Sequence, residues 1–497
     1  MALAGGRRAA TGVAWRKAAT AVGGGAVSVA SVPKLWRQHG NRLSVRPADA
    51  GSVLLWAERL VSPAVLGAAR ALLRRAEFDR DADTVDGSPT FELLWAHKGE
   101  YVHAELADVF RSTIETKLLP VLRGEPSLYA HGDAQQLVLC EALVRVYAEG
   151  QRRVHPAHYD TDALVTAVFE VDLGGPRFEG SGFYVQPSAH VASRIAVPLA
   201  PGDVIAHSFD LQHGVEVTAG MRCSVIMWFA DSKDACCDKN RSWCVAAAEA
   251  GNADAQYVLA GHLDKERLDT DEPQVQVLSL LRAAAQQGHF SSQNYLGHVL
   301  QQLGATTTRS CEQRCDDTAE ALRWFEASAA QGFHKAMVSL SRHCTAEGDT
   351  VSAIRWLRMA AEQRADPAVL HELWLLCSEV AKLGVGDQQH ENGGREWLQM
   401  AAEMGYPASQ LAMGRVLLAT PGHTLEAEAW LRKASDHGMI EASVQLGARH
   451  MRAGRPVDAV RMLWTAYRNW SRPSSKQQAT AKTNGKQWMP KFDLHAG

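Results

Sequence analysis

Residues 397–414 read WLQMAAEMGYPASQLAMG, and this stretch carries the pattern that decides the fold of the second half of the chain. Trp397 opens the segment, Ala401 and Ala402 form a pair of small residues, and Gly405 follows them. Small alanines let two antiparallel helices approach closely, and glycine readily takes the left-handed conformation that ends a helix. The segment therefore predicts two antiparallel helices joined by a turn at Gly405.

The same pattern recurs from Trp243 onward, at intervals in the thirties to low forties. The turn glycines are Gly251, Gly288, Gly332, Gly405 and Gly438. The clearest opening tryptophans are Trp324, Trp356, Trp397 and Trp430. In the fourth of about six units Arg364 stands at the glycine position, so the geometry of that turn should differ. A helix-turn-helix unit repeated at this spacing predicts an all-α solenoid.

This unit resembles the Sel-one-like repeat, a relative of the tetratricopeptide repeat, over roughly residues 243–470. The resemblance implies a scaffold that binds a protein partner or peptide on its concave face. The alternative is that the repeats only support the rest of the chain or form a dimer surface.

The first half of the chain has a different period. Helical spacing runs from about residue 52 to 123, with one apolar stripe from Val65 to Leu73 and another from Leu106 to Leu118. After Pro126 short β-branched runs separated by turn residues take over. These runs are residues 142–148, 164–171, 182–185, 203–206 and 223–229. Short strands with turns between them predict a β-sandwich or jelly roll, with helices packed on one side.

Three residues in this β region have the character of metal ligands. Side chains two positions apart on a strand point to the same face, so His158 and Asp160 can reach one metal. His213, which follows the predicted strand 203–206, can supply a third ligand. Two histidines and one carboxylate form the facial triad of non-haem iron oxygenases, which leaves open positions for a co-substrate and dioxygen. His207 is the alternative to His213, although its position favours a packed or surface residue; His155 and His190 fit loop histidines better.

Arg222 lies nine residues beyond His213. A planar guanidinium binds a carboxylate through two hydrogen bonds, which suits the far carboxylate of 2-oxoglutarate. Ser224 lies on the same strand face and could add a hydroxyl, and Tyr147 could donate a further hydrogen bond. The structural alternatives are that His158 and Asp160 form a turn pair on the surface, and that Arg222 forms an ordinary salt bridge.

The stretch from about Val138 to Asp231 resembles the prolyl 4-hydroxylase and lysyl hydroxylase group of oxygenases. The motifs that carry this resemblance are residues 147–151, 156–160, 178–182, 202–203 and 213–229. The resemblance implies a double-stranded β-helix, Fe(II) held by His158, Asp160 and His213, and 2-oxoglutarate anchored by Arg222 with Tyr147. Ascorbate is a further candidate cofactor. Ala157 and Ser181 depart from the family pattern in loops that face the substrate, which bears on the substrate class rather than on the metal.

Length and composition limit the number of domains and the classes of partner. A chain of 497 residues is too long for one core, and its 46% hydrophobic and 22% charged residues are ordinary for a globular protein. A net charge of -3 without a basic stripe outside the termini argues against a nucleic-acid partner. No run approaches the roughly 18 apolar residues of a spanning helix, so we expect no transmembrane segment. The nine cysteines are scattered like neither a disulfide framework nor a zinc site; Cys311 and Cys315 fit thiols on a helix surface, and a reducing compartment fits best.

The two ends of the chain differ from its centre. Residues 1–48 are rich in arginine and alanine and contain no acidic residue. This composition indicates either a disordered basic arm or a transit peptide for import into a mitochondrion or plastid, with the cytoplasm and the secretory pathway as alternatives. The tail 471–497 is polar and basic, and we expect it to be disordered. Residues 49–235 then form the oxygenase domain and residues 241–470 the repeats.

These observations predict a multidomain α+β protein in which a jelly-roll oxygenase precedes a helical solenoid. The leading hypothesis is a dioxygenase that uses dioxygen and 2-oxoglutarate to hydroxylate a C–H bond. A protein-binding solenoid favours a prolyl or lysyl residue of a protein substrate. The alternatives are a small-molecule oxygenase and a catalytically silent interaction scaffold.

Overall fold

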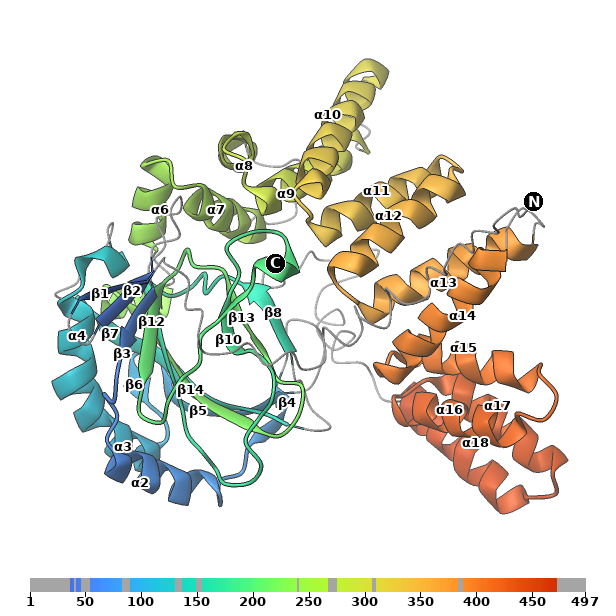
Figure 1. Cartoon of the computed structure of the whole chain (residues 1–497), viewed down its shortest axis with the longest axis horizontal. Helices are drawn as coiled ribbons and strands as arrows, with labels where there is room; N and C mark the ends of the chain where they lie inside the picture. Colours follow the sequence, from blue (N-terminus) through green and yellow to red (C-terminus); the bar gives the residue numbers. More distant parts are fainter. Residues whose placement is uncertain are drawn as a thin grey trace, which may run out of the picture. The chain divides into compact units, whose positions relative to one another are not determined.

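The computed structural model describes residues 36–39, 42–45, 54–82, 90–129, 136–148, 154–238, 241–266, 275–305, 310–382 and 388–471. The chain forms two compact units, of which one ends at Gln331 and the other begins at Gly332. The first unit contains both β-sheets and the beginning of the helical array (Figure 1). The join that we expected near residues 236–240 lies inside this unit. Of the predicted tail 471–497, Ser471 is the last residue of helix α18, and the remainder lies outside the described residues.

A large antiparallel sheet forms the frame of the first unit. Its strands run in the order β1-β2-β3-β12-β9-β14-β7-β5-β4, with β6 paired to β5. Their bounds are β1 Trp36–His39, β2 Arg42–Val45, β3 Leu54–Ala57, β4 Asp79–Ala82, β5 Thr90–His97, β6 Glu100–Tyr101, β7 Val138–Tyr147, β9 Val165–Glu170, β12 Val204–Ser208 and β14 Arg222–Ala230. β1 and β2 extend this sheet into the segment that we expected to be disordered; the remainder of residues 1–48 lies outside the described residues.

A second antiparallel sheet has four strands in the order β11-β10-β13-β8. Their bounds are β8 Val154–His158, β10 Gly182–Val185, β11 Ile195–Ala196 and β13 His213–Glu216. The two sheets share one hydrophobic core, because Phe183 and Val185 of the small sheet cluster with Val168, Ile205 and Ile226 of the large one. We call the side of the large sheet that carries these residues its inner face. The two facing antiparallel sheets agree with the expected sandwich, while a double-stranded β-helix stays a prediction.

Helices cover the outer face of the large sheet: α2 Pro63–Leu73, α3 Ala104–Thr113, a π-helical turn at Ile114–Leu118 and α4 Leu119–Arg123 (Figure 1). Phe110 of α3 packs edge-on against Phe169 of β9, with ring centroids 5.4 Å apart. The apolar stripes at 65–73 and 106–118 are therefore helical, as expected. The expectation of helix throughout 52–123 is wrong, because β3, β4, β5 and β6 lie within it. In those segments pairing with neighbouring strands outweighs the local helical spacing of Leu and Ala.

One disulfide lies among the described residues. It joins Cys140 of β7 to Cys236 of α5 (Lys233–Asp238), 96 residues later, with Cα atoms 5.0 Å apart. This pair differs from the expectation of free thiols, because the two cysteines meet only once α5 has docked beside β7. Cys311 and Cys315 are free and exposed, as expected.

Reduction of the Cys140–Cys236 bond should destabilise the first unit. A cross-link that closes so long a loop restricts the unfolded chain and typically contributes about 2–4 kcal/mol. We expect a lower midpoint of thermal unfolding, followed by circular dichroism, when a reductant is added. The Cys140→Ser variant should already unfold at the lower midpoint and should not respond to the reductant. Nine titratable thiols in the unreduced protein would contradict the pairing.

Thirteen helices follow α5 among the described residues. In the first unit they are α6 Ser242–Glu249, α7 Ala253–Glu266, α8 Val275–Gln286, α9 Phe290–Gly304 and α10 Cys311–Ala330. In the second unit they are α11 His334–Ala346, α12 Thr350–Gln363, α13 Pro367–Lys382, α14 Gln388–Glu403, α15 Pro407–Leu418, α16 Thr424–Asp436, α17 Ile440–Arg452 and α18 Pro456–Ser471. The predicted helical repeat is thus present.

The glycines of the repeat act in two ways. The five turn glycines all have φ between 86° and 91°, a left-handed conformation that ends the preceding helix, whereas Arg364 at the fourth turn is extended with φ −151°. Gly297 lies inside α9 instead, where a Cβ would come within 2.6 Å of the ring of Phe325 in α10. Glycine therefore allows both the turn and the close approach of neighbouring helices.

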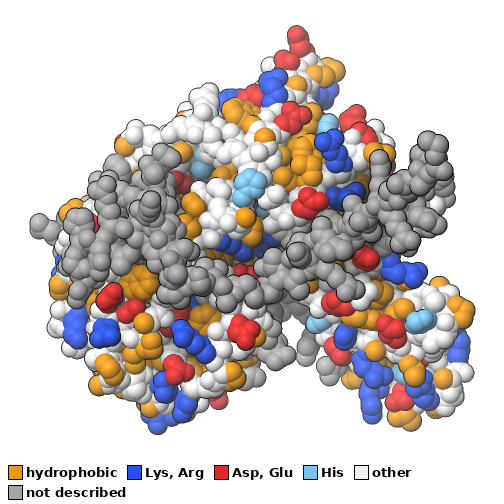
Figure 2. Space-filling view, viewed as in Figure 1, with side chains coloured by type: hydrophobic (Ala, Val, Ile, Leu, Met, Phe, Trp, Pro, Cys, Tyr) orange, Lys and Arg blue, Asp and Glu red, His pale blue; other side chains and the backbone are white. Residues whose placement is uncertain are grey.

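No described helix is long and apolar enough to cross a membrane. On the face shown in Figure 2, basic and acidic side chains are interspersed over the described residues rather than gathered by sign.

Candidate metal centre

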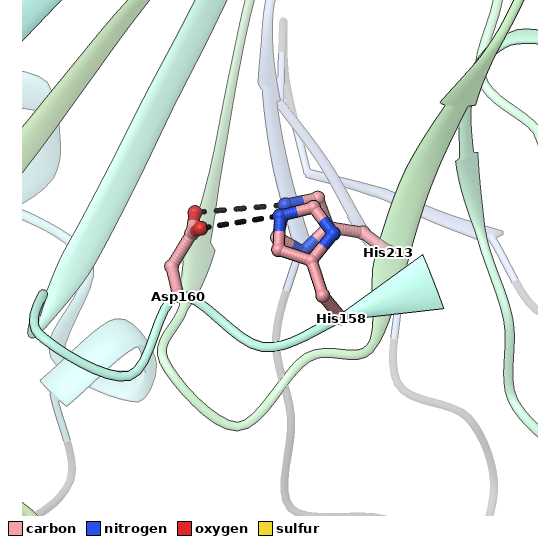
Figure 3. A group of neighbouring side chains, drawn as sticks. All are labelled: His158, Asp160 and His213. Carbon is pink, nitrogen blue, oxygen red and sulfur yellow. Dashed lines mark ion pairs between the residues drawn. The ribbon is translucent and has the colours of Figure 1, made fainter. Parts of the chain in front are cut away.

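Two neighbouring strands of the small sheet bring the predicted ligands together. His158 ends β8, His213 begins β13, and the register places these two residues opposite each other. Asp160 follows β8 by two residues. The Nε2 atom of His158 lies 3.5 Å from Asp160 Oδ1, and the Nε2 atom of His213 lies 3.5 Å from the other carboxylate oxygen, Oδ2 (Figure 3). One donor atom from each of the three residues lies within 4.8 Å of the others, a spacing at which they could hold one metal ion.

Backbone contacts fix the orientation of both imidazoles. His158 Nδ1 lies 2.9 Å from the carbonyl oxygen of Pro156, and His213 Nδ1 lies 3.0 Å from that of Leu211. A carbonyl oxygen can only accept, so Nδ1 is the protonated nitrogen of each neutral ring. Each Nε2 is then left with a lone pair directed toward the carboxylate, which is the tautomer that a metal ligand needs.

The charge states of the group suit a divalent cation. Burial lowers the pKa of His213 well below its usual range, and the nearby His207 imidazole lowers it further. Burial alone would raise the pKa of Asp160, but the imidazoles of His213 and His158 outweigh it and hold that pKa well below its usual range. A neutral imidazole and an ionised carboxylate are the forms that coordinate a metal.

Thr166 forms a hydrogen bond with the carboxylate of Asp160. Its hydroxyl donates to Asp160 Oδ2 at 2.7 Å, and its side chain is fully buried on the inner face of β9. This hydrogen bond limits the rotation of the carboxylate, as is usual for an oxygen ligand of a metal.

His207 lies beside the three residues. It is completely buried in β12, its Nε2 is 3.7 Å from Asp160 Oδ2, and its ring centroid is 4.2 Å from that of His213. It is therefore a packed and not a surface residue. Among the described residues, the compact group of three donors includes His213 and not His207.

His155 differs from its expected place. It lies on strand β8 and is buried, with its ring stacked on that of His158 at 4.0 Å between centroids, rather than in a loop. β8 is short and its sequence is polar for a strand, so the sequence pattern did not predict it. His190 does lie between regular elements, as expected.

The predicted co-substrate residues line the inner face of β14 and β7. Arg222 pairs with Tyr147 across the two strands, and the Tyr147 ring centroid lies 5.7 Å from the guanidinium carbon. Arg222 Nε donates to Glu170 Oε1 at 2.8 Å. The sequence did not indicate Glu170, because its partner lies 52 residues away on a neighbouring strand.

Three buried polar groups of Arg222 and Ser224 lack hydrogen-bond partners among the described residues. Both terminal nitrogens of Arg222 and the hydroxyl of Ser224 are buried without a hydrogen-bond partner among the described residues. A buried donor that makes no hydrogen bond costs roughly 1–3 kcal/mol, and more when it is charged. An anionic oxygen ligand would satisfy all three at once, so these residues fit the carboxylate end of 2-oxoglutarate.

The sequence matches no protein-family model and no curated protein. Among solved structures, the chain is similar to the uropathogenic Escherichia coli protective antigen c5321, which has an SLR fold, with 21% identity and a TM-score of 0.38 over 53% of this chain and 62% of that one. It is similar to a Sel1 repeat protein from Oxalobacter formigenes, with 21% identity and a TM-score of 0.35 over 44% and 89%. It is also similar to an oxidoreductase of the 2OG-Fe(II) oxygenase family from Burkholderia pseudomallei, with 17% identity and a TM-score of 0.29 over 37% and 85%.

These neighbours include both repeat proteins and oxygenases of the kinds that the sequence resembles. Their identities are low and their coverage is partial, so they establish neither membership of a family nor an activity.

Proposed function

We propose that the first unit is an iron- and 2-oxoglutarate-dependent dioxygenase that hydroxylates a C–H bond. The observation that carries this proposal is the presence of two donor sets, one on each of the two sheets that share the hydrophobic core. His158, Asp160 and His213 present metal-type donors, and Arg222 and Ser224 present buried donors without partners. A structural salt bridge would account for Arg222 Nε alone, but not for its two terminal nitrogens.

Each residue has a role in this proposal. His158 and His213 offer lone pairs at Nε2, and Asp160 offers a negative oxygen that Thr166 holds in place. Glu170 orients Arg222 through Nε, so that the remaining fork can bind a carboxylate in two-point fashion. Fe(II) and 2-oxoglutarate, when bound, would allow dioxygen to act as the oxidant of the C–H bond.

We further propose a protein substrate, with a prolyl or lysyl side chain as the target. The support for this step is architectural: a helical-repeat array follows the sheets in the same chain, and such arrays usually present extended binding surfaces.

The test is the release of succinate from 2-oxoglutarate by protein loaded with iron under nitrogen, measured once air is admitted. We expect release that increases with a pool of proline- and lysine-rich peptides. Release that peptides do not change would retain the oxygenase and point to a small-molecule substrate. No release together with no binding of 2-oxoglutarate would identify a scaffold that lacks catalysis.

A further inference from the structure

The residue between two candidate ligands faces the helical array. Tyr159 follows His158 and precedes Asp160, and successive side chains of an extended segment point to opposite sides. Its side chain is 3% exposed. Its hydroxyl donates to Asp254 Oδ1 in α7 at 2.6 Å.

His289 completes this contact from the start of α9. Its Nδ1 caps the helix by accepting from the backbone N–H of Ser292, so the proton of the neutral ring lies on Nε2. Nε2 lies 3.2 Å from the Tyr159 hydroxyl oxygen and 3.3 Å from Asp254 Oδ1. The Tyr159 hydroxyl can therefore accept from His289 while it donates to Asp254.

The rest of this ligand loop is attached to the same helices. The carbonyl oxygen of Thr161 lies 3.1 Å from His262 Nε2 in α7. Asp162 accepts from Arg241 Nε at 2.9 Å, immediately before α6. Every residue from 159 to 162 except the ligand Asp160 thus has a polar contact with the first two helix pairs.

The loop that leads to the third ligand has a contact of its own. Asp210, three residues before His213, accepts a hydrogen bond of 2.9 Å from Asn252, which lies between α6 and α7. The two loops that position the candidate ligands therefore share one support, although more than 40 residues separate them.

We infer that helices α6–α9 form part of the candidate metal centre, with Tyr159 as a positioning residue that sets the separation of His158 and Asp160. This inference rests on the proposed function, because it assumes that these two side chains bind a metal. It assigns the beginning of the repeat array a role within the oxygenase, in addition to any partner binding by later repeats. It also accounts for a compact unit that extends to Gln331 instead of ending with the last strand.

The physical basis is the precision that a metal demands. Ligands must be held within about 0.5 Å of the productive geometry, and loss of a supporting contact typically weakens metal binding by roughly 10–100-fold. His158 ends a five-residue strand, and Asp160 lies in the loop that follows it. The backbone N–H of Ala163 donates to the carbonyl oxygen of Asp160 at 3.2 Å, which closes the turn but does not tie the loop to another element. The contacts of Tyr159 supply that constraint.

The test compares two tyrosine variants of the full chain, with Co(II) as the metal probe. Tyr159→Phe removes only the hydroxyl, and we expect Co(II) affinity to fall by roughly 10–100-fold, with a changed visible absorption spectrum of the bound ion. Tyr295→Phe is the matched control, since Tyr295 in α9 donates to Asp264 Oδ2 in α7 at the same 2.6 Å, a hydrogen bond between two helices of the array. We expect this control to keep the affinity and spectrum of the natural protein.

A second pair guards against a variant that does not fold. Asp254→Asn keeps an oxygen that can accept from Tyr159 and should bind Co(II) nearly as the natural protein does, whereas Asp254→Ala should match Tyr159→Phe. Equal Co(II) affinity and spectra in the Tyr159→Phe and Tyr295→Phe variants would overturn the inference. Absence of Co(II) binding by the natural protein would instead overturn the proposed function.

Discussion

Replacement of His213 by alanine should abolish succinate release and weaken metal binding by more than the roughly 10–100-fold that loss of a supporting contact costs. His213 supplies one of three donors, and two donors cannot define a facial triad. The measurements are Co(II) titration under nitrogen and succinate release in air. The helical array should retain its circular dichroism, because α6–α18 contain no part of β13.

The His207→Ala variant is the comparison for His213→Ala. His207 is also a buried histidine beside Asp160, so both variants remove an imidazole of equal size from the same core. We expect the His207→Ala variant to keep measurable metal binding. The reverse order, with metal binding lost in His207→Ala and kept in His213→Ala, would assign the third ligand to His207.

Replacement of Arg222 by glutamine should remove binding of 2-oxoglutarate while leaving binding of the metal. Loss of one partner from a buried, hydrogen-bonded charge pair costs about 2–5 kcal/mol, or roughly 30- to 4,000-fold in affinity. Glutamine can still donate from its amide nitrogen, but it carries neither the positive charge nor the two parallel donor nitrogens of a guanidinium. Titration of 2-oxoglutarate into the Co(II)-loaded protein measures the effect.

Metal affinity is the internal control for the Arg222→Gln variant. Arg222 also pairs with Glu170, so its loss leaves a carboxylate in a largely buried position and should lower the stability of the sheet. Unchanged Co(II) affinity would show that the site survived this loss. Unchanged affinity for 2-oxoglutarate would mean that Arg222 serves Glu170 alone, and the co-substrate assignment would be wrong.

More of the candidate metal site than of the surrounding fold could be predicted from the sequence. His158 and Asp160 could be grouped because alternation along a strand is a local property, and His213 could be added from its motif. The supporting residues could not be found this way. Glu170 becomes a partner of Arg222 only through the pairing of β9 with β14, and the two residues are 52 positions apart in the chain. Thr166 lies only six residues beyond Asp160, but the turn between β8 and β9 brings them together, and alternation along a strand does not predict the shape of that turn.

In the fold, too, the elements set by local sequence could be predicted, and those set by contacts between distant segments could not. The helical repeat is a local pattern, and the turn at Arg364 differs from the glycine turns as the substitution predicted. Strands β3 and β5 were missed because their leucine- and alanine-rich sequences fit a helix equally well, and only pairing with β12 and β7 decides their conformation. The bond between Cys140 and Cys236 likewise depends on tertiary docking.

The contacts of Tyr159 also set an order of events during synthesis. Asp254 lies 95 residues beyond Tyr159 and His289 lies 130 residues beyond it. A ribosome that adds about 5–20 residues per second needs some seconds to make that length of chain. The strands that carry His158 and His213 thus leave the ribosome well before the helices that steady the loop between the ligands. A nascent chain halted before α6 would carry all three candidate ligands without that support, so a finished metal site should follow, rather than precede, the emergence of the first two helix pairs.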